Sequence, residues 1–166
     1  MILSRKDILK LIEEKKLAII PFTKSNIGPA SIDLTLSDEF RTFGKQKRIT
    51  LAESTDYKKY SKKIKTNQIT LLPGGFLLGI TRERISLPPN ICGTLTGRSR
   101  FARLGFAIHI TASFIQPGID NQQVLEMTNT GPAPLVLKAG TRVCQLVLQE
   151  MKSSARYRGK FQRQLL

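Results

Sequence analysis

The chain has 166 residues, of which 40% are hydrophobic and 23% are charged, and this is the composition of one globular domain that can bury a core. Its 27 Lys and Arg residues outnumber its 12 Asp and Glu residues, and the net charge of +15 predicts an anionic partner such as a nucleic acid, an anionic membrane or a phosphorylated small molecule. One histidine and two distant cysteines exclude a cysteine zinc finger and a histidine-rich metal centre, so no zinc is expected.

The pattern predicts one helix followed by many short strands. Ser4, with Asp7 three residues later, is typical of a helix start, and apolar residues recur at helical spacing from there to about Lys16. Beyond the helix, short apolar or alternating segments are separated by Gly and Pro turns, which is typical of an all-β barrel or sandwich. The predicted strands are residues 32–36, 76–80, 91–96, 106–113, 123–128, 135–137 and 143–148.

Basic residues gather in three segments. Residues 41–66 carry nine Lys and Arg side chains against two acids, and we interpret this segment as a solvated loop. Residues 151–166 carry five basic side chains and no acid, which predicts a basic tail. The third segment is an arginine-rich turn at residues 97–105, which has a more specific pattern.

The arginine-rich turn is suited to binding an anion. Its backbone N–H groups, the Ser99 hydroxyl and its guanidinium groups could all contact one phosphate, because the planar guanidinium donates two parallel hydrogen bonds. Ser99 and Arg103 are four residues apart and would share a face of one helical turn. On its chemistry alone, the segment fits an ordinary surface turn equally well.

The predicted strand 123–128 presents a carboxylate. Alternation puts Val124, Glu126 and Thr128 on one face of the strand and Leu125 and Met127 on the other. The alternation alone indicates an exposed glutamate on a half-buried strand.

Five short motifs follow one another in a continuous register from Gly97 to Glu126. They are Gly97-Arg98-Ser99, Ala102-Arg103-Leu104-Gly105, His109-Ile110-Thr111-Ala112, Pro117-Gly118 and Val124-Leu125-Glu126. Together they resemble the signature region of dCTP deaminases, the deaminase members of the trimeric dUTPase-like superfamily. Asp33, within residues 28–34, resembles the family's first motif, and residues 157–164 resemble its C-terminal motif. The resemblance therefore covers nearly the whole chain.

The resemblance implies a mainly β fold, a distorted antiparallel β-barrel or jelly-roll of the dUTPase-like type with a short N-terminal helix. Residues 1–166 would form a single domain, in which the basic tail, residues 151–166, acts as a lid over bound nucleotide. The resemblance also implies a homotrimer with active sites between its subunits.

The implied reaction is the hydrolytic deamination of dCTP to dUTP and ammonia, which feeds dUMP and dTTP synthesis. The family needs no zinc, so a positioned carboxylate must take the proton from the attacking water. Mg²⁺ is expected only as the ion that accompanies the triphosphate. The expected partner is thus a small-molecule nucleotide rather than a membrane or a nucleic acid.

Residue by residue, the resemblance assigns catalysis to Glu126, Ser99 and Arg103. Glu126 would be the base, the Ser99 hydroxyl would hold the water or the amino group, and Arg103 would balance the carboxylate near the reacting end of the cytosine. His109 is left open between a structural and a catalytic histidine. The expected nucleotide-binding residues are Arg98, Arg100, Thr111, Ala112, Gln116, Val124, Tyr157, Lys160 and Gln164.

Three positions depart from the family pattern. Arg100 replaces a usual Ser, Phe114 stands where many bacterial members have an arginine or another residue, and Gln116 replaces an Asp. In dUTP-hydrolysing relatives that aspartate orients the water that attacks the phosphate chain, and a neutral glutamine is a poor base. Gln116 thus argues against the nearest alternative, a dUTP diphosphatase alone or combined with deamination. A third interpretation is a non-enzymatic barrel that binds a nucleotide or nucleic acid, for which Tyr57 and Tyr60 between lysines are the only hint.

The expected location is the cytoplasm. No stretch approaches the roughly 20 apolar residues of a membrane span, and the first residues lack the apolar core of a signal peptide. Two cysteines in a chain of this length do not suggest a disulfide framework, which fits a reducing compartment.

Overall fold

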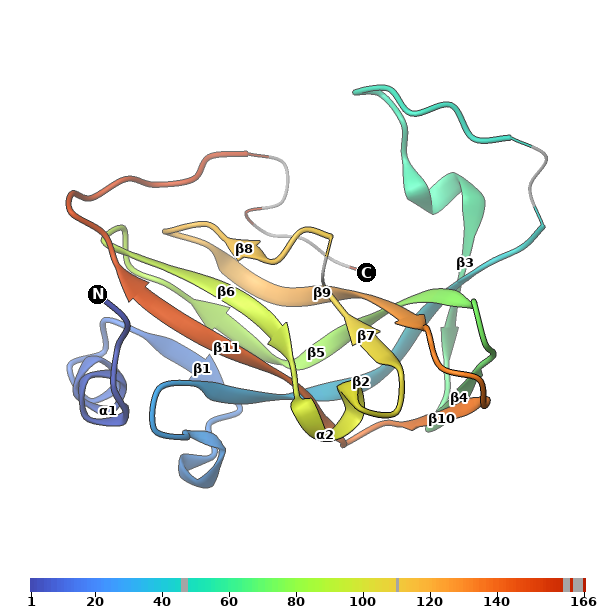
Figure 1. Ribbon diagram of the computed structural model, residues 1–166. Coiled ribbons are helices and arrows are strands. Elements are labelled where there is room, and N and C mark those ends of the chain that lie inside the picture. The colour runs from blue at the N-terminus through green and yellow to red at the C-terminus, as the bar shows by residue number, and fades with distance from the viewer. Residues whose placement is uncertain (46–47, 110, 160–161, 163–165) are drawn as a thin grey trace.

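A curled antiparallel sheet makes up most of the protein (Figure 1). The computed structural model describes residues 1–45, 48–109, 111–159, 162 and 166. Its strands are β1 (Ala18–Ile20), β2 (Ile32–Phe43), β3 (Ser61–Lys65), β4 (Gln68–Leu71), β5 (Phe76–Ser86), β6 (Ile91–Gly97), β7 (Phe106–Ile108), β8 (Phe114–Ile115), β9 (Asp120–Asn129), β10 (Leu135–Lys138) and β11 (Arg142–Glu150). Its helices are α1 (Arg5–Glu13) and α2 (Ser99–Ala102), with 3-10 turns at Lys24–Asn26 and Tyr57–Tyr60.

Within the described residues, nine strands form one sheet in the order β7-β9-β5-β2-β11-β6-β8, with β1 beside β5 and β3 beside β2. β4 and β10 pair separately. The sheet curls into half a barrel around a core of Ile, Leu and Phe side chains. This architecture confirms the expected mainly β fold with one short N-terminal helix.

Helix α1 begins as the sequence predicts. The Ser4 hydroxyl accepts a hydrogen bond from the Asp7 N–H (3.4 Å), and the Asp7 carboxylate accepts one from the Ser4 N–H (2.9 Å). Hydrogen bonding to Ser4 also holds the pKa of the Asp7 carboxyl below its usual range. The helix ends at Glu13, short of the predicted end near Lys16. No helix in the described part of the chain is long and apolar enough to cross a membrane.

The alternation predicted for residues 123–128 is confirmed in β9. Every second residue of this strand is buried, from Asn121 to Asn129, and the residues between them are partly exposed. Leu125 and Met127 join the core, whereas Glu126 lies on the opposite face. Because successive side chains of a strand point to opposite faces, the Glu126 carboxylate lies outside the core.

The predicted strand 106–113 is wrong beyond Ile108. β7 pairs with β9, but His109 then adopts a φ of 53°, in the left-handed region that residues other than glycine rarely enter. The chain leaves β9 at this point and continues as β8, which pairs with β6 instead. β7 and β8, which are consecutive in the chain, are therefore at the two ends of the strand order.

The interpretation of residues 41–66 as a solvated loop is also partly wrong. Residues 61–65 form β3, whose Lys63 pairs with Glu39 on β2 (2.8 Å). Arg41 is buried, and its guanidinium lies 5.8 Å from the centre of the Tyr57 ring. Lysines at most positions of β3 hide the alternation by which a half-buried strand is usually recognised.

The described part of the basic tail lies against its own chain. The Tyr157 N–H donates a hydrogen bond to the Pro117 carbonyl oxygen (3.0 Å), which fixes Tyr157 beside the turn between β8 and β9. Two predicted nucleotide-binding residues of the tail, Lys160 and Gln164, lie outside the described residues.

Candidate active site

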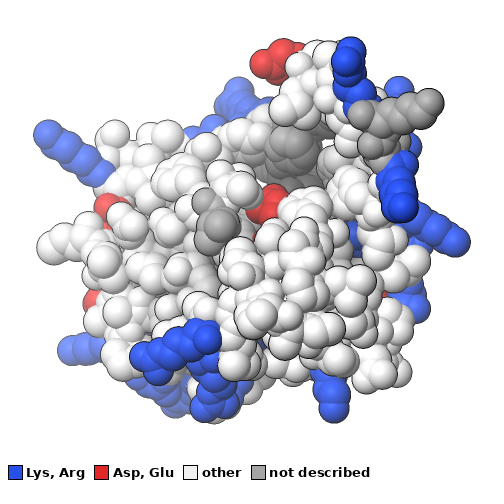
Figure 2. Space-filling view, turned by 45° about the vertical axis from the view of Figure 1, so that its right-hand side comes forward, with Lys and Arg blue, Asp and Glu red and all other residues white. Residues whose placement is uncertain are grey.

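A pocket of about 710 Å³ opens between β9 and the segment that precedes β3. Figure 2 shows the corresponding face hollowed, with Lys and Arg side chains around the hollow. The volume lies within the roughly 300–1,000 Å³ that small-molecule sites occupy. The pocket is therefore large enough for a nucleotide's base and sugar.

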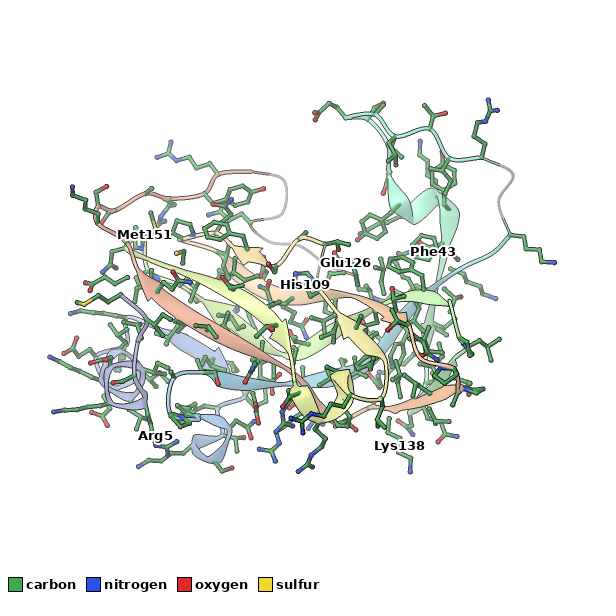
Figure 3. All side chains as sticks on the ribbon, in the orientation of Figure 1. Arg5, Phe43, His109, Glu126, Lys138 and Met151 are labelled. Atoms are coloured by element: carbon green, nitrogen blue, oxygen red, sulfur yellow. The ribbon has the colours of Figure 1, made fainter. Side chains whose placement is uncertain are left out.

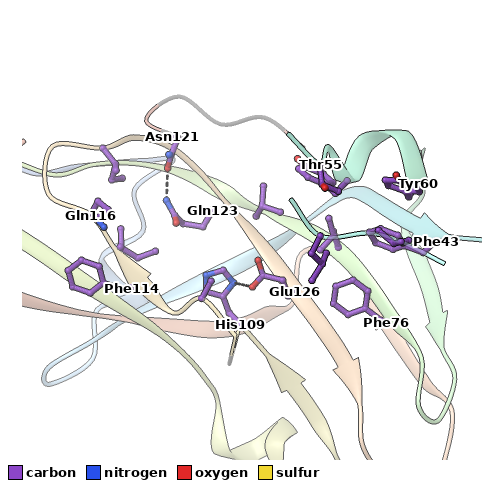
Figure 4. Close-up of a pocket in the computed structure, with 18 of the residues that line it drawn as sticks. Phe43, Thr55, Tyr60, Phe76, His109, Phe114, Gln116, Asn121, Gln123 and Glu126 are labelled. Atoms are coloured by element: carbon purple, nitrogen blue, oxygen red, sulfur yellow. Dashed lines mark hydrogen bonds and ion pairs between the residues drawn. The ribbon is translucent and has the colours of Figure 1, made fainter. Parts of the chain in front are cut away.

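One wall of the pocket is mainly apolar, and the facing wall carries most of its polar groups (Figure 4). The apolar wall comes from β2, β5 and the segment before β3, and it includes Phe43, Ile49, Leu51, Tyr57 and Phe76. The facing wall comes from β8, β9 and the residues that flank them. Its polar side chains are His109, Gln116, Asn121, Gln123 and Glu126, and its apolar ones include Phe114, Ile115, Ile119 and Val124. A flat heterocyclic ring with polar edges matches this division.

Glu126 is the one acidic side chain among the described residues that line the pocket. Its Oε2 lies 2.6 Å from Nδ1 of His109 and accepts a hydrogen bond from the Thr111 hydroxyl (3.3 Å). In the described part of the chain, Oε1 has no hydrogen-bond or ion-pair partner. One carboxylate oxygen is thus anchored, and the other is available to a water in the pocket.

Several of the predicted site residues gather around Glu126. Thr111 contacts it directly, and Val124 precedes it by two residues on the same face of β9. The other predicted residues that line the pocket are Ala112, Gln116 and Tyr157.

The arginine-rich turn lies elsewhere in the same chain. α2 lies between β6 and β7 at the lower edge of the molecule in Figures 1 and 3, at the end of β7 that is away from His109, and the side chains of Ser99, Arg100 and Arg103 are exposed. The Arg103 N–H donates to the Ser99 carbonyl oxygen (3.1 Å), so the two residues share one helical turn as predicted. Neither lines the pocket. The structure of the single chain therefore does not bring Ser99 and Arg103 to Glu126.

Arg98 is held in place by Asp33. Oδ2 of Asp33 lies 3.0 Å from Nη2 of Arg98 and 3.4 Å from Nη1 of Arg142, and Arg98 also donates to the Arg142 carbonyl oxygen (2.9 Å). One carboxylate thus orients two guanidinium groups beside α2, with one positive charge in excess. Sequence reasoning missed Arg142, because only the pairing of β11 with both β2 and β6 shows that these residues meet.

The turn that presents α2 depends on Gly105. This residue has a φ of +83°, and a Cβ there would overlap the backbone of Gly131. We expect Gly105→Ala to lower the free energy of unfolding by about 2 kcal/mol or more, as measured by urea denaturation. Gly140→Ala is the matched control, because φ is +84° there but no atom lies within 4 Å of the added Cβ. Equal losses in the two variants would contradict the importance of the Gly131 contact.

The cysteines are not placed to act as nucleophiles. Cys92 and Cys144 are both free and buried, and burial, together with the nearby carboxylates of Glu83 and Asp33, raises the pKa of the Cys144 thiol to about 12. Among the described residues, no three His, Cys, Asp or Glu side chains are grouped so that they could hold a metal ion. The reactive group that the pocket does offer is the Glu126 carboxylate.

The contribution of residues 49–60 to an apolar wall of the pocket was not predicted from the sequence. The wall's side chains, among them Ile49, Leu51 and Tyr57, alternate with lysines and polar residues and have no strand or helix period. The available signal was the presence of apolar and aromatic residues in a segment that is otherwise basic.

The half-barrel fold and the pocket with its single carboxylate place the chain among β-proteins that bind a small molecule and can activate a water. Its fold matches the crystal structure of 2'-deoxycytidine 5'-triphosphate deaminase from Agrobacterium tumefaciens with a TM-score of 0.72 and 19% identity. The match covers 90% of this chain and 48% of that one, so the chain spans about half the length of that protein, and at this identity the match shows the fold alone.

The sequence comparisons identify the family. The family model described as dCTP deaminase-like matches residues 2–151. A protein of Methanosphaera stadtmanae named "dCTP deaminase, dUMP-forming" is 38% identical over 158 residues, which are 92% of this chain and 80% of that protein. A dCTP deaminase of Halorubrum lacusprofundi is 38% identical over 163 residues, or 94% of this chain and 80% of the relative. The chain belongs to the dCTP deaminase-like family, which confirms the resemblance and the dUTPase-like fold that it implies.

Proposed function

We propose that the protein is a dCTP deaminase that hydrolyses dCTP to dUTP and ammonia in the cytoplasm. The observation that carries the proposal is Glu126, whose Oε2 is anchored by His109 and Thr111 while Oε1 is available in a pocket that fits a nucleotide base. The family of the chain and the names of its relatives support the same substrate.

In the proposed reaction, a water at Oε1 of Glu126 attacks C4 of the cytosine. The carboxylate takes a proton from the water and passes it to N3, which gives an intermediate with a hydroxyl and an amino group on C4. The hydroxyl proton then passes through the same carboxylate to the amino group. The C4–N bond breaks, ammonia leaves, and C4 carries the carbonyl oxygen of dUTP.

The remaining catalytic groups are proposed to come from a neighbouring subunit. Ser99 and Arg103 lie outside the pocket of their own chain, so a homotrimer with sites between subunits would bring α2 of one chain to the pocket of the next. There the Ser99 hydroxyl would hold the water or the amino group, and Arg103 would balance the charge of Glu126. The exposure of α2 within one subunit supports this arrangement.

The triphosphate is proposed to bind between the arginine-rich turn and the basic tail. Arg98 suits this role because Asp33 already fixes its guanidinium. Mg²⁺ would enter as the counterion of the nucleotide, as part of the substrate. The other proposed binding residues are Arg100, Tyr157, Lys160 and Gln164 for the phosphates, and Thr111, Ala112, Gln116 and Val124 for the base and sugar.

Gln116 favours dUTP rather than dUMP as the product. Its neutral amide lines the pocket at the position where dUTP-hydrolysing relatives use an aspartate, and an amide cannot take a proton from a water that attacks the phosphate chain. Conversion of dCTP to dUMP is the second candidate, because the relative from M. stadtmanae is named dUMP-forming.

Product analysis separates the two candidates. The protein is incubated with dCTP and, separately, with dUTP, each with Mg²⁺, and the products are separated by anion-exchange chromatography. We expect dUTP without pyrophosphate from dCTP, and no change in dUTP. Formation of dUMP and pyrophosphate from dCTP would establish the second candidate, and their formation from dUTP but not from dCTP would establish a dUTP diphosphatase. If neither nucleotide changed, deamination would be refuted in favour of a nucleotide-binding barrel without activity.

A further inference from the structure

His109 contacts Glu126 with both its side chain and its backbone. The ring is buried, with 7% of the side chain exposed, and its Nδ1 lies 2.6 Å from Oε2 of Glu126 (Figure 4). The His109 N–H donates a hydrogen bond to the Glu126 carbonyl oxygen (2.8 Å). His109 therefore contacts both the backbone and the carboxylate of Glu126.

This contact requires an unusual backbone at His109. A φ of 53° is rare for a residue with a side chain, and such conformations persist mainly where the surrounding structure needs them. Here the left-handed turn ends β7 and brings the imidazole over β9. If β7 continued in register, the side chain of residue 109 would follow the alternation of the strand instead.

The contact between Nδ1 and Oε2 is close but not well directed. Oε2 lies off the line along which a proton on Nδ1 would point, so Nδ1 has no regular hydrogen-bond partner within the described residues. Catalytic hydrogen bonds are often poorly aligned before substrate binds and become aligned in the complex. The Nδ1–Oε2 geometry is therefore consistent with a hydrogen bond that becomes aligned when substrate binds and the site closes.

We infer that His109 is a positioning residue for the carboxylate that activates the water. The Thr111 hydroxyl donates to Oε2. In the closed site Nδ1 of His109, which lies 2.6 Å from the same oxygen, would also donate to it and leave Oε1 for the water. The inference rests on the proposed function, because it assigns a role in that reaction. It predicts that His109 affects the rate of the chemical step through Glu126 and has little effect on nucleotide affinity.

Steady-state kinetics with dCTP test this role. His109→Leu keeps the bulk of the side chain but removes the donor, and we expect kcat to fall about 10²-fold with little change in KM. His109→Gln, whose amide can donate to Oε2, should recover part of the loss. Thr128→Val is the matched control, because Thr128 lies on the same face of β9 but is not among the described hydrogen-bond and ion-pair partners of the Glu126 carboxylate. A loss in kcat that His109→Gln does not relieve would overturn the inference.

A double-mutant cycle separates positioning from a general structural effect. If His109 acts through the carboxylate, His109→Leu should cause no further loss of kcat in a Glu126→Gln background. Losses that multiply would overturn the inference and leave the proposed function intact. If the wild type does not convert dCTP, the proposed function fails, and crystal structures of the wild type and His109→Leu then test the inference alone. The same single carboxylate orientation in both structures would overturn it.

Discussion

Replacing Glu126 with glutamine is expected to lower the rate of dCTP deamination by at least about 10²-fold, the usual scale for a general acid–base residue. The amide matches the carboxylate in size but cannot take a proton from water. The apolar wall and the other polar residues of the pocket are unchanged, so dCTP should still bind. Ammonia release at saturating dCTP measures the rate, and isothermal titration calorimetry measures the affinity.

Glu13→Gln is the control for this variant, since it makes the same change in charge at an exposed position on α1, away from the pocket. We expect the Glu13→Gln protein to retain wild-type turnover. Near-normal turnover by Glu126→Gln would remove Glu126 from the mechanism, whatever the substrate affinity.

Mixing two inactive variants is expected to restore activity if the sites lie between subunits. Arg103→Ala removes the guanidinium from α2, and Glu126→Gln removes the carboxylate from the pocket, so a trimer of either variant has no complete site. In trimers assembled at random from equal amounts, about one site in four pairs an intact pocket with an intact α2, which predicts about a quarter of wild-type activity. Co-expression of two differently tagged chains, followed by an assay of the purified mixed trimers, measures this recovery.

The matched control combines Glu126→Gln with His109→Leu. Both changes lie in the same pocket, so no mixed trimer contains an intact one, and the activity should stay at the mean of the two parents. If the Arg103→Ala mixture recovered no more activity than this control, the proposed sharing of sites between subunits would be wrong.

β9 shows how far the sequence alone can lead. The period of two over residues 123–128 correctly predicts that Glu126 faces away from Leu125 and Met127. The buried Asn121 and Asn129 at the two ends of the strand show no such pattern in the sequence. The start of α1 was predictable for a similar reason, because Ser4 and Asp7 satisfy backbone groups within one turn. In both cases the interactions that decide the structure are local.

His109 and the apolar wall show why other features could not be predicted. The left-handed backbone of His109 depends on contacts with β9, and its own sequence suggests a strand that continues to residue 113. Likewise, the wall between residues 49 and 60 forms because β3 returns the chain to β2. The separation of α2 from the pocket depends on how all the strands of the sheet are arranged, and no local sequence pattern predicts that arrangement.

The central claim is that the Glu126 pocket removes the amino group of dCTP and leaves its triphosphate intact. The most direct test is the product balance of the wild-type protein, with ammonia, dUTP and pyrophosphate quantified over one time course with dCTP. We predict equal amounts of ammonia and dUTP and no pyrophosphate. Consumption of dCTP without ammonia release, release of pyrophosphate, or no consumption at all would contradict the claim.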